Sequence, residues 1–272
     1  MDMVHLKKPE SWQKNVEDFF HIVADIKRPG FDKFLDYLVK HTDFLKAPAS
    51  TRFHASYEGG LLFHSINVHN RLLRLMTAEV NANGKSQSLS GEELDAFFES
   101  IAIVALFHDL CKALSYVVDT RNKQTGRKIP DGRGGERDEW EKVPFYAYSP
   151  QLGFGHAEKS IILMEKFFKL TEEETGAILY HMGDYRNQPD MSFVFNTNVL
   201  AVNLHLADMQ ATYIDESCVP EKTAQNTKDP EVLALYKAFK EKYKDIINPA
   251  PDNGGDGDAS GDDNLDGVID ES

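Results

Sequence analysis

Long hydrophobic runs and paired cysteines are both missing from this chain of 272 residues. No stretch approaches the roughly 18 uninterrupted apolar residues of a membrane-spanning helix, so we expect no membrane partner. The segment Met1–Glu10 carries charges and a proline but no apolar run, so we expect no secretory signal. The two cysteines, Cys111 and Cys218, match no metal or redox spacing. A reduced, cytoplasmic location is therefore expected.

The chain also lacks the short motifs of three common enzyme classes. It has no G-x-x-x-x-G-K-[ST] phosphate loop, no G-x-G-x-x-G dinucleotide fingerprint and no G-x-S-x-G nucleophile turn. These absences argue against P-loop nucleotide hydrolases, dinucleotide-dependent enzymes and serine hydrolases.

Basic residues are in short supply, with 30 Lys and Arg against 44 Asp and Glu and a net charge of −14. Eight of the acids fall in the base-free, Asp- and Gly-rich tail 249–272, which we expect to be disordered. Without that tail the net charge is −6, so indiscriminate binding to long nucleic acid is not expected. A small anionic substrate, or a strand end held by a local basic patch, remains compatible with this charge.

Apolar residues recur at helical spacing through most of the chain, and no convincing alternating strand is present. We therefore predict an all-α bundle, with N-terminal helices in residues 1–45 packed on a main domain over residues 46–248. Thr171 and Glu174 form a capping-box pattern at the start of one of these helices. The predicted helices are Ser11–Ile26, Phe31–Lys40, Gly59–Val80, Gly91–Ala113, Ala157–Lys169, Glu172–His181, Val194–Glu216 and Glu231–Ile247.

One polar segment, residues 120–137, is predicted to be a long loop. It holds six bases and two acids, and it directly follows the apolar helix that ends near Ala113. Long loops without secondary structure are usually functional or disordered. We expect this loop to fold over a site at the helix end and attract a polyanion, although a plain surface loop remains an alternative.

Five of the ten histidines fall at helix ends or on buried helix faces, which is unusual for a helical core. Asp109 follows one of them directly at the end of a nearly all-apolar helix. Burying an ionised carboxylate without a partner is costly, and a divalent cation would supply that partner. Mixed imidazole and carboxylate ligands suit Mn, Fe, Co, Ni or Zn better than Ca. The histidines are His64, His108, His156, His181 and His205.

In their order along the chain, these residues resemble the HD-domain superfamily of metal-dependent phosphohydrolases. The local sequences are similar to the HD domain of YhaM-type 3′–5′ exoribonucleases, and the similarity spans roughly Ala47 to Tyr213. Those exoribonucleases carry an OB-type domain before the HD domain, whereas only about fifty residues, read as helices, precede the motifs here. The matching segments are Tyr57–His64, Leu106–Lys112, Gly155–Ser160 and Leu204–Met209.

The resemblance implies two adjacent divalent ions (Mn, Fe, Co, Ni, Zn or Mg) with Asp109 as the shared ligand. One ion would be held by His64, His108, Asp109 and Asp208, and the other by Asp109, His156 and His181. For His205 we expect a role in orienting Asp208 rather than in binding metal.

Four further residues are candidates for contact with a substrate phosphate. Lys112 lies four residues after His108, on the same face of the predicted helix, and is expected to act on the phosphate as a point charge. Lys159 is expected to act in the same way, so that Asp109 and the two lysines form the catalytic set. Arg52 and His54, which precede the first motif, are expected to bind the phosphate or the leaving group.

The predicted activity is hydrolysis of a phosphate ester in a nucleotide or at a nucleic-acid end, with a phosphodiesterase or 3′–5′ exonuclease as the leading reading. A phosphorylated small molecule is also possible as the substrate. Three alternatives stay open: a nucleotidase or deoxynucleoside triphosphate hydrolase, a metal-containing regulatory or binding module without turnover, and a di-iron oxygenase on the same fold. The sequence leaves the oligomeric state open.

Overall fold

The computed structural model describes residues 11–82, 90–150, 152–183 and 190–216, together with the single positions 234, 237, 238 and 241. The expected tail 249–272 and most of the predicted helix Glu231–Ile247 lie outside these residues. Among the described helices, none is both long and apolar enough to cross a bilayer. The described part of the protein is mostly helical, with one two-stranded sheet.

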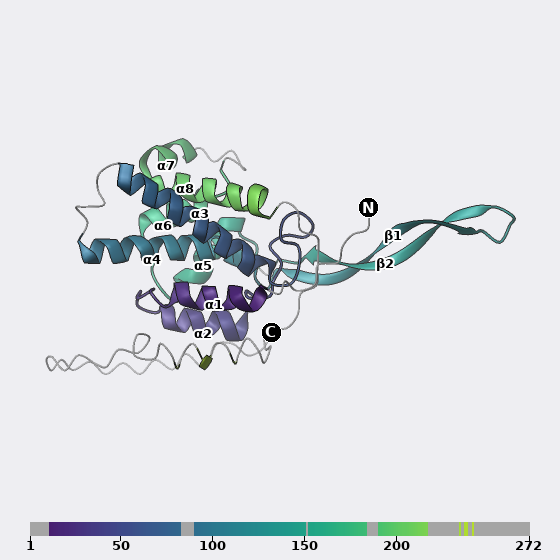
Figure 1. The fold of residues 1–272 in the computed structure, drawn as a ribbon, viewed down its shortest axis with the longest axis horizontal. Coiled ribbons are helices and arrows are strands. Elements are labelled where there is room, and N and C mark those ends of the chain that lie inside the picture. Colours follow the sequence, from purple (N-terminus) through teal and green to yellow (C-terminus); the bar gives the residue numbers. More distant parts are fainter. Residues whose placement is uncertain are drawn as a thin grey trace.

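Two long helices, α3 and α4, run side by side through the middle of the helical body, with α1 and α2 on one side and α7 and α8 on the other (Figure 1). Helices α5 and α6 pack against each other, and α6 also contacts α4 and α8. The helices are α1 Trp12–Val23, α2 Phe31–His41, α3 Gly60–Ala82, α4 Gly91–Phe107, α5 His156–Glu165, α6 Glu172–Tyr180, α7 Met191–Thr197 and α8 Val199–Gln210.

A cluster of phenylalanines fixes the end of α4. The ring of Phe107, the last residue of this helix, is fully buried. It meets Phe34 edge-on at 5.0 Å between ring centroids and Phe19 edge-on at 6.2 Å. Phe44 and Phe31 complete the contact at 5.8 and 6.0 Å. Because rings of α1, α2 and the segment after α2 pack around Phe107, the position of the two residues that follow it is fixed by the core.

A buried ion-pair network ties the segment after α1 to α4 and α6. Arg28 contacts Glu174 at 2.8 Å and Glu99 at 2.8 Å, and Glu174 is completely buried. Glu174 also accepts a hydrogen bond from Ser100 and closes the capping box with Thr171, which confirms the capping predicted from sequence. Arg28 thus supplies the positive charge that this buried carboxylate needs.

The segment 120–137 is not a loop, and the prediction of an all-α chain is wrong at this point. Strands β1 (Tyr116–Pro130) and β2 (Glu136–Tyr148) pair antiparallel and form a ribbon that projects from the helical body (Figure 1). The turn is made by Asp131, whose carboxylate accepts hydrogen bonds from the backbone of Arg133 and Gly135. The ribbon leads away from the body rather than folding over it.

Two of the predicted helices end or break earlier than expected. The helix predicted to reach Ala113 ends at Phe107, and the 3₁₀ turn η2 (Leu110–Lys112) follows after Asp109. The helix predicted over Val194–Glu216 is divided at Asn198, whose side chain accepts a hydrogen bond from the backbone of Ala201 and caps α8. After α8 the chain continues as the π-helical turn η3 (Ala211–Asp215).

Replacing Arg28 by methionine should destabilise the fold strongly. The change leaves Glu174 buried without its positive partner, and breaking a buried ion pair in this way costs about 3 kcal/mol or more. The free energy of unfolding, measured by urea denaturation, is expected to fall by that amount. Lys40→Met is the control, because the pair that Lys40 forms with Asp36 is exposed to solvent, and its loss should change stability by about 0–1 kcal/mol. Equal effects of the two substitutions would contradict this assignment.

Candidate metal centre

The start of α3 places His64 in the interior. At Gly60 a Cβ atom would lie 1.9 Å from the carbonyl oxygen of Ala55, and at Gly59, with φ of +81°, it would lie 2.4 Å from the ring of Trp12. Only glycine permits both approaches. The two glycines therefore let the preceding loop, which carries His54, pack directly against the first turn of α3.

Three histidines are fixed in the same tautomer by acceptors on their Nδ1 side. His108 donates from Nδ1 to the carbonyl of Ala105 at 2.9 Å, and His181 donates to the carbonyl of Ile178 at 2.6 Å. His64 Nδ1 lies 3.1 Å from the carboxylate of Glu216. With Nδ1 directed at these acceptors, each ring presents its Nε2 to the space between the helices.

Those three Nε2 atoms are buried and have no hydrogen-bond partner among the described residues. Their distances to carboxylate oxygens of Asp109 and Asp208 lie between 3.3 and 3.7 Å. Buried polar atoms are normally satisfied, so three Nε2 atoms without hydrogen bonds, all facing the same carboxylates, require an explanation. A cation bound between them provides one.

Asp109 stands at the centre of this group and is almost completely buried. One of its oxygens lies 2.6 Å from His156 Nε2, and the other lies 2.5 Å from the ammonium of Lys112. Burial acts to raise the pKa of Asp109, but the charges of Lys112, His108 and His156 outweigh it and hold the pKa well below its usual value. The carboxylate is thus ionised and already has positive partners. The stronger indication of a cation site is therefore the set of histidine Nε2 atoms without hydrogen bonds.

The other titratable groups separate into charged and neutral members. Burial lowers the pKa of His181 to about 3. For His156 the charge of Asp109 overcomes burial and raises the pKa to about 10. The pKa of His64 is raised well above its ordinary value because Glu216, Asp109 and Asp208 together outweigh burial. Metal binding would displace the additional protons of His64 and His156, so it should be coupled to proton release.

The structure brings all six predicted metal residues into one cluster. In four groups of three residues, the candidate ligand atoms lie within 4.8 Å of one another. Asp109 and His64 each belong to two of these groups. The groups are His64–His108–Asp109, His108–His181–Asp208, Asp109–His156–His181 and His54–His64–Glu216.

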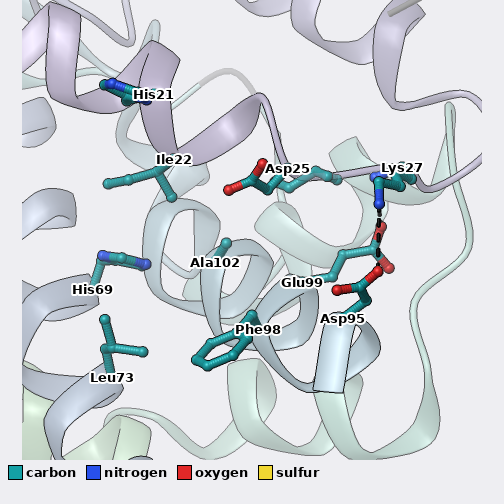
Figure 2. A pocket seen from close by; sticks show the side chains of 11 residues that line it. His21, Ile22, Asp25, Lys27, His69, Leu73, Asp95, Phe98, Glu99 and Ala102 are labelled. Carbon is teal, nitrogen blue, oxygen red and sulfur yellow. Dashed lines mark hydrogen bonds and ion pairs between the residues drawn. The ribbon is translucent and has the colours of Figure 1, made fainter. Parts of the chain in front are cut away.

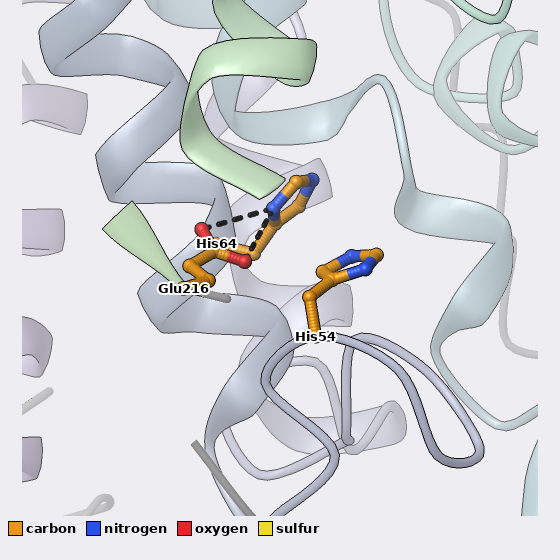
Figure 3. Close-up of side chains that lie close together, drawn as sticks. All are labelled: His54, His64 and Glu216. Atoms are coloured by element: carbon orange, nitrogen blue, oxygen red, sulfur yellow. Dashed lines mark hydrogen bonds and ion pairs between the residues drawn. The ribbon is translucent and has the colours of Figure 1, made fainter. Parts of the chain in front are cut away.

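Glu216 was not predicted from the sequence. Figure 3 shows its carboxylate directed at the His64 ring, with His54 on the neighbouring loop. Glu216 is fully buried and also accepts a hydrogen bond from Asn67 at 3.0 Å. A carboxylate on the far nitrogen of a metal-binding histidine orients the ring and raises its basicity. The sequence signal was an acid at the end of an apolar helix, which is too common to single out.

The remaining candidates lie in different places. Burial and the nearby charge of Lys112 lower the pKa of His54 to about 4, and its ring centroid lies 4.9 Å from that of His64. Lys159, in contrast, is directed at Tyr148 on β2, whose hydroxyl lies 3.1 Å from its ammonium. Arg52 is exposed, and its guanidinium lies over the ring of Phe53. The structure therefore places His54 and Lys112 beside the cluster, whereas the contact of Lys159 is with the ribbon and Arg52 is exposed.

His205 makes a contact that was not predicted from the sequence. Its Nδ1 lies 2.6 Å from the backbone carbonyl of His181, so it holds the main chain after α6. A Cβ at Gly183 would lie 3.1 Å from the His205 ring. His205 therefore packs closely on residues 181–183 and helps to position His181, a candidate metal ligand.

A separate hollow of about 500 Å³ lies between α1, α3 and α4 (Figure 2). His21, His69 and Phe98 line it, and Lys27 bridges to Asp95 across its edge at 3.4 Å. It shares no residue with the histidine cluster.

Comparison with protein-family models, curated proteins and solved structures finds no match for this chain. The functional assignment is therefore based on the side chains of the cluster.

Metal should stabilise the protein through Asp109. A ligand present at 100 times its dissociation constant stabilises the native state by about 2.7 kcal/mol, so Mn²⁺ or Zn²⁺ is expected to raise the Tm of metal-free protein by several degrees. Asp109→Asn keeps the shape but removes the charge, and its Tm should no longer respond. His41→Gln changes an exposed histidine on α2 and should respond like the wild type. A metal response that survives Asp109→Asn would place the site elsewhere.

Proposed function

We propose that this protein is a metal-dependent phosphohydrolase of the HD-domain superfamily that acts on a phosphate ester in a nucleotide or at a nucleic-acid end. The observation that carries the proposal is the set of three buried, unpartnered Nε2 atoms facing two ionised carboxylates. The order of these residues along the chain, with His108 and Asp109 adjacent, supports the superfamily.

The donor set fits divalent transition metals. Imidazole nitrogens and carboxylate oxygens together suit Mn, Fe, Co, Ni or Zn. His64, His108, Asp109 and Asp208 would hold one ion, and Asp109, His156 and His181 would hold a second. When bound, such ions neutralise charge on phosphoryl oxygens and make water a nucleophile near neutral pH.

The chain's own residues supply the binding and orientation of the substrate. Lys112 has its ammonium 2.5 Å from Asp109, and a seventh of its side chain is exposed, so it can place a positive charge on a phosphoryl oxygen beside the shared carboxylate. His54 is neutral and half-buried next to His64, so its ring can donate or accept one hydrogen bond at the substrate.

The ribbon supports a substrate longer than a mononucleotide. Burial raises the pKa of Tyr116, at the root of the ribbon, to about 12, and the charges of Lys112 and Asp109 also act on its hydroxyl. The root of the ribbon is therefore electrostatically coupled to the cluster. Between the root of the ribbon and the bulge at Gln124, strand alternation places ten residues, Tyr116 included, on one face, and only one of these ten is charged. Exposed aromatic rings on such a surface can stack on unpaired bases. The ten are Tyr116, Val118, Thr120, Asn122, Gln124, Trp140, Lys142, Pro144, Tyr146 and Tyr148.

Phosphate-ester turnover should depend on added metal and on Asp109. With Mn²⁺, the protein is expected to hydrolyse at least one member of a panel of bis-p-nitrophenyl phosphate, mononucleotides, deoxynucleoside triphosphates, cyclic dinucleotides and short single-stranded RNA and DNA. Asp109→Asn should lower kcat/KM at least 100-fold.

The pattern of turnover also separates the related activities. Cleavage of triphosphates alone would indicate a triphosphohydrolase, and cleavage of monophosphates alone a nucleotidase. Metal-loaded protein that turns over nothing in the panel would contradict the hydrolase and favour a binding module. An oxygen-sensitive diferrous centre without hydrolysis would favour an oxygenase.

The ribbon face should affect only long substrates. Trp140→Ala combined with Lys142→Gln removes an exposed ring and the one charge from this face. Because stacking contributes about 1–3 kcal/mol per base, KM for a short single-stranded oligonucleotide should rise about tenfold. KM for bis-p-nitrophenyl phosphate should not change. The matched control, Lys123→Gln with Val143→Ala on the opposite face, should leave both KM values unchanged. An unchanged oligonucleotide KM in the first variant would remove the ribbon from substrate binding.

A further inference from the structure

The thiol of Cys111 lies beside the ring of His156, outside the set of groups that face the metal centre. We propose that Cys111 is a positioning residue that holds His156 as a metal ligand and thereby sets the affinity of the weaker of two metal sites. This inference rests on the metal-dependent function proposed above.

The four histidines in the cluster are held at their Nδ1 atoms by three kinds of acceptor. Two use main-chain carbonyls, and His64 uses the carboxylate of Glu216. His156 uses sulfur: its Nδ1 lies 3.1 Å from Cys111 Sγ, whereas its Nε2 lies 3.9 Å from that sulfur and 2.6 Å from Asp109. With Nδ1–H donated to the sulfur, Nε2 is the nitrogen left to face a cation.

The sulfur itself is firmly placed. Cys111 is 4% exposed and lies within η2. Its backbone N–H donates to Ser160 Oγ at 3.0 Å, and its carbonyl accepts from Ser115 Oγ at 2.6 Å. Ser160 lies one helical turn after His156 on α5, so the contact joins the start of α5 to η2 at the point where the histidine leaves the helix.

We therefore expect the two metal sites to differ in affinity. A thiol sulfur is a weaker acceptor than a carbonyl or a carboxylate, so His156 is held less strongly than the other three rings. Its side chain is also 31% exposed, whereas those of His64, His108 and His181 are fully buried. The site that uses His156 should therefore fill second and empty first.

Metal titration of three proteins tests this assignment without measuring turnover. Metal-free wild type, Cys111→Ala and Cys111→Ser are titrated with Mn²⁺, and free ion is followed by electron paramagnetic resonance. Wild type should bind two ions with unequal affinity. In Cys111→Ala the weaker site should lose about 10- to 100-fold in affinity while the tighter site is unchanged, as when an outer partner of a ligand is removed. Cys111→Ser, which keeps an acceptor, should restore wild-type binding.

The possible outcomes separate the inference from the function on which it rests. Wild type that binds no ion would refute the proposed function itself. Wild type that binds ions with affinities untouched by Cys111→Ala would overturn only the role of Cys111. Equal weakening of both sites, with no rescue by serine, would also overturn it, because that pattern indicates lost packing. If the alanine variant does not fold, Cys111→Val fills the space without an acceptor, and its comparison with Cys111→Ser decides the question.

Discussion

The arrangement of the site depends on the ion pairs of the buried Asp109 carboxylate with Lys112 and His156. Asp109 follows Phe107 and His108 at the end of α4, where rings from α1, α2 and the following segment prevent the helix end from shifting. From this position its oxygens reach His156 on α5 and Lys112 on η2. An ionised group with so little solvent around it must be matched by positive charge or by a cation. The elements that surround α4 are therefore arranged around this one charge.

The same balance explains why the cluster is compatible with a stable fold. Lys112 and a protonated His156 compensate Asp109, and His64 lies between Asp208 and Glu216. His181 remains neutral because burial disfavours its charged form. The charged groups thus alternate in sign across the site. A divalent ion would replace protons in an arrangement that already provides the complementary negative charge.

Much of the helical framework and the residues of the central cluster could be predicted from the sequence, because the signals were local. A histidine–aspartate pair in an apolar helix is costly to bury, and the capping box at Thr171 marks a helix start wherever the helix packs. Glu216 could not be predicted, since it reaches His64 only after the chain breaks at Asn198 and turns through η3. The ribbon was missed because it has solvent on most of both faces, so its burial leaves no clear alternation in hydrophobicity. The contact of Lys159 with Tyr148 could not be predicted for the same reason, since Tyr148 belongs to the ribbon.

The candidate ligands are distributed at the ends of elements. His156 is the first residue of α5, His108 and His181 directly follow α4 and α6, and Asp208 is close to the end of α8. The site is therefore defined by where helices begin and stop, more than by which faces they present. One residue added inside α4 would turn His108 by about 100° and shift it by about 1.5 Å relative to the rest of the cluster. Helix length is thus constrained as tightly as the identity of the ligands, and tolerance to insertions should be greatest in the projecting ribbon, whose tip supplies no ligand.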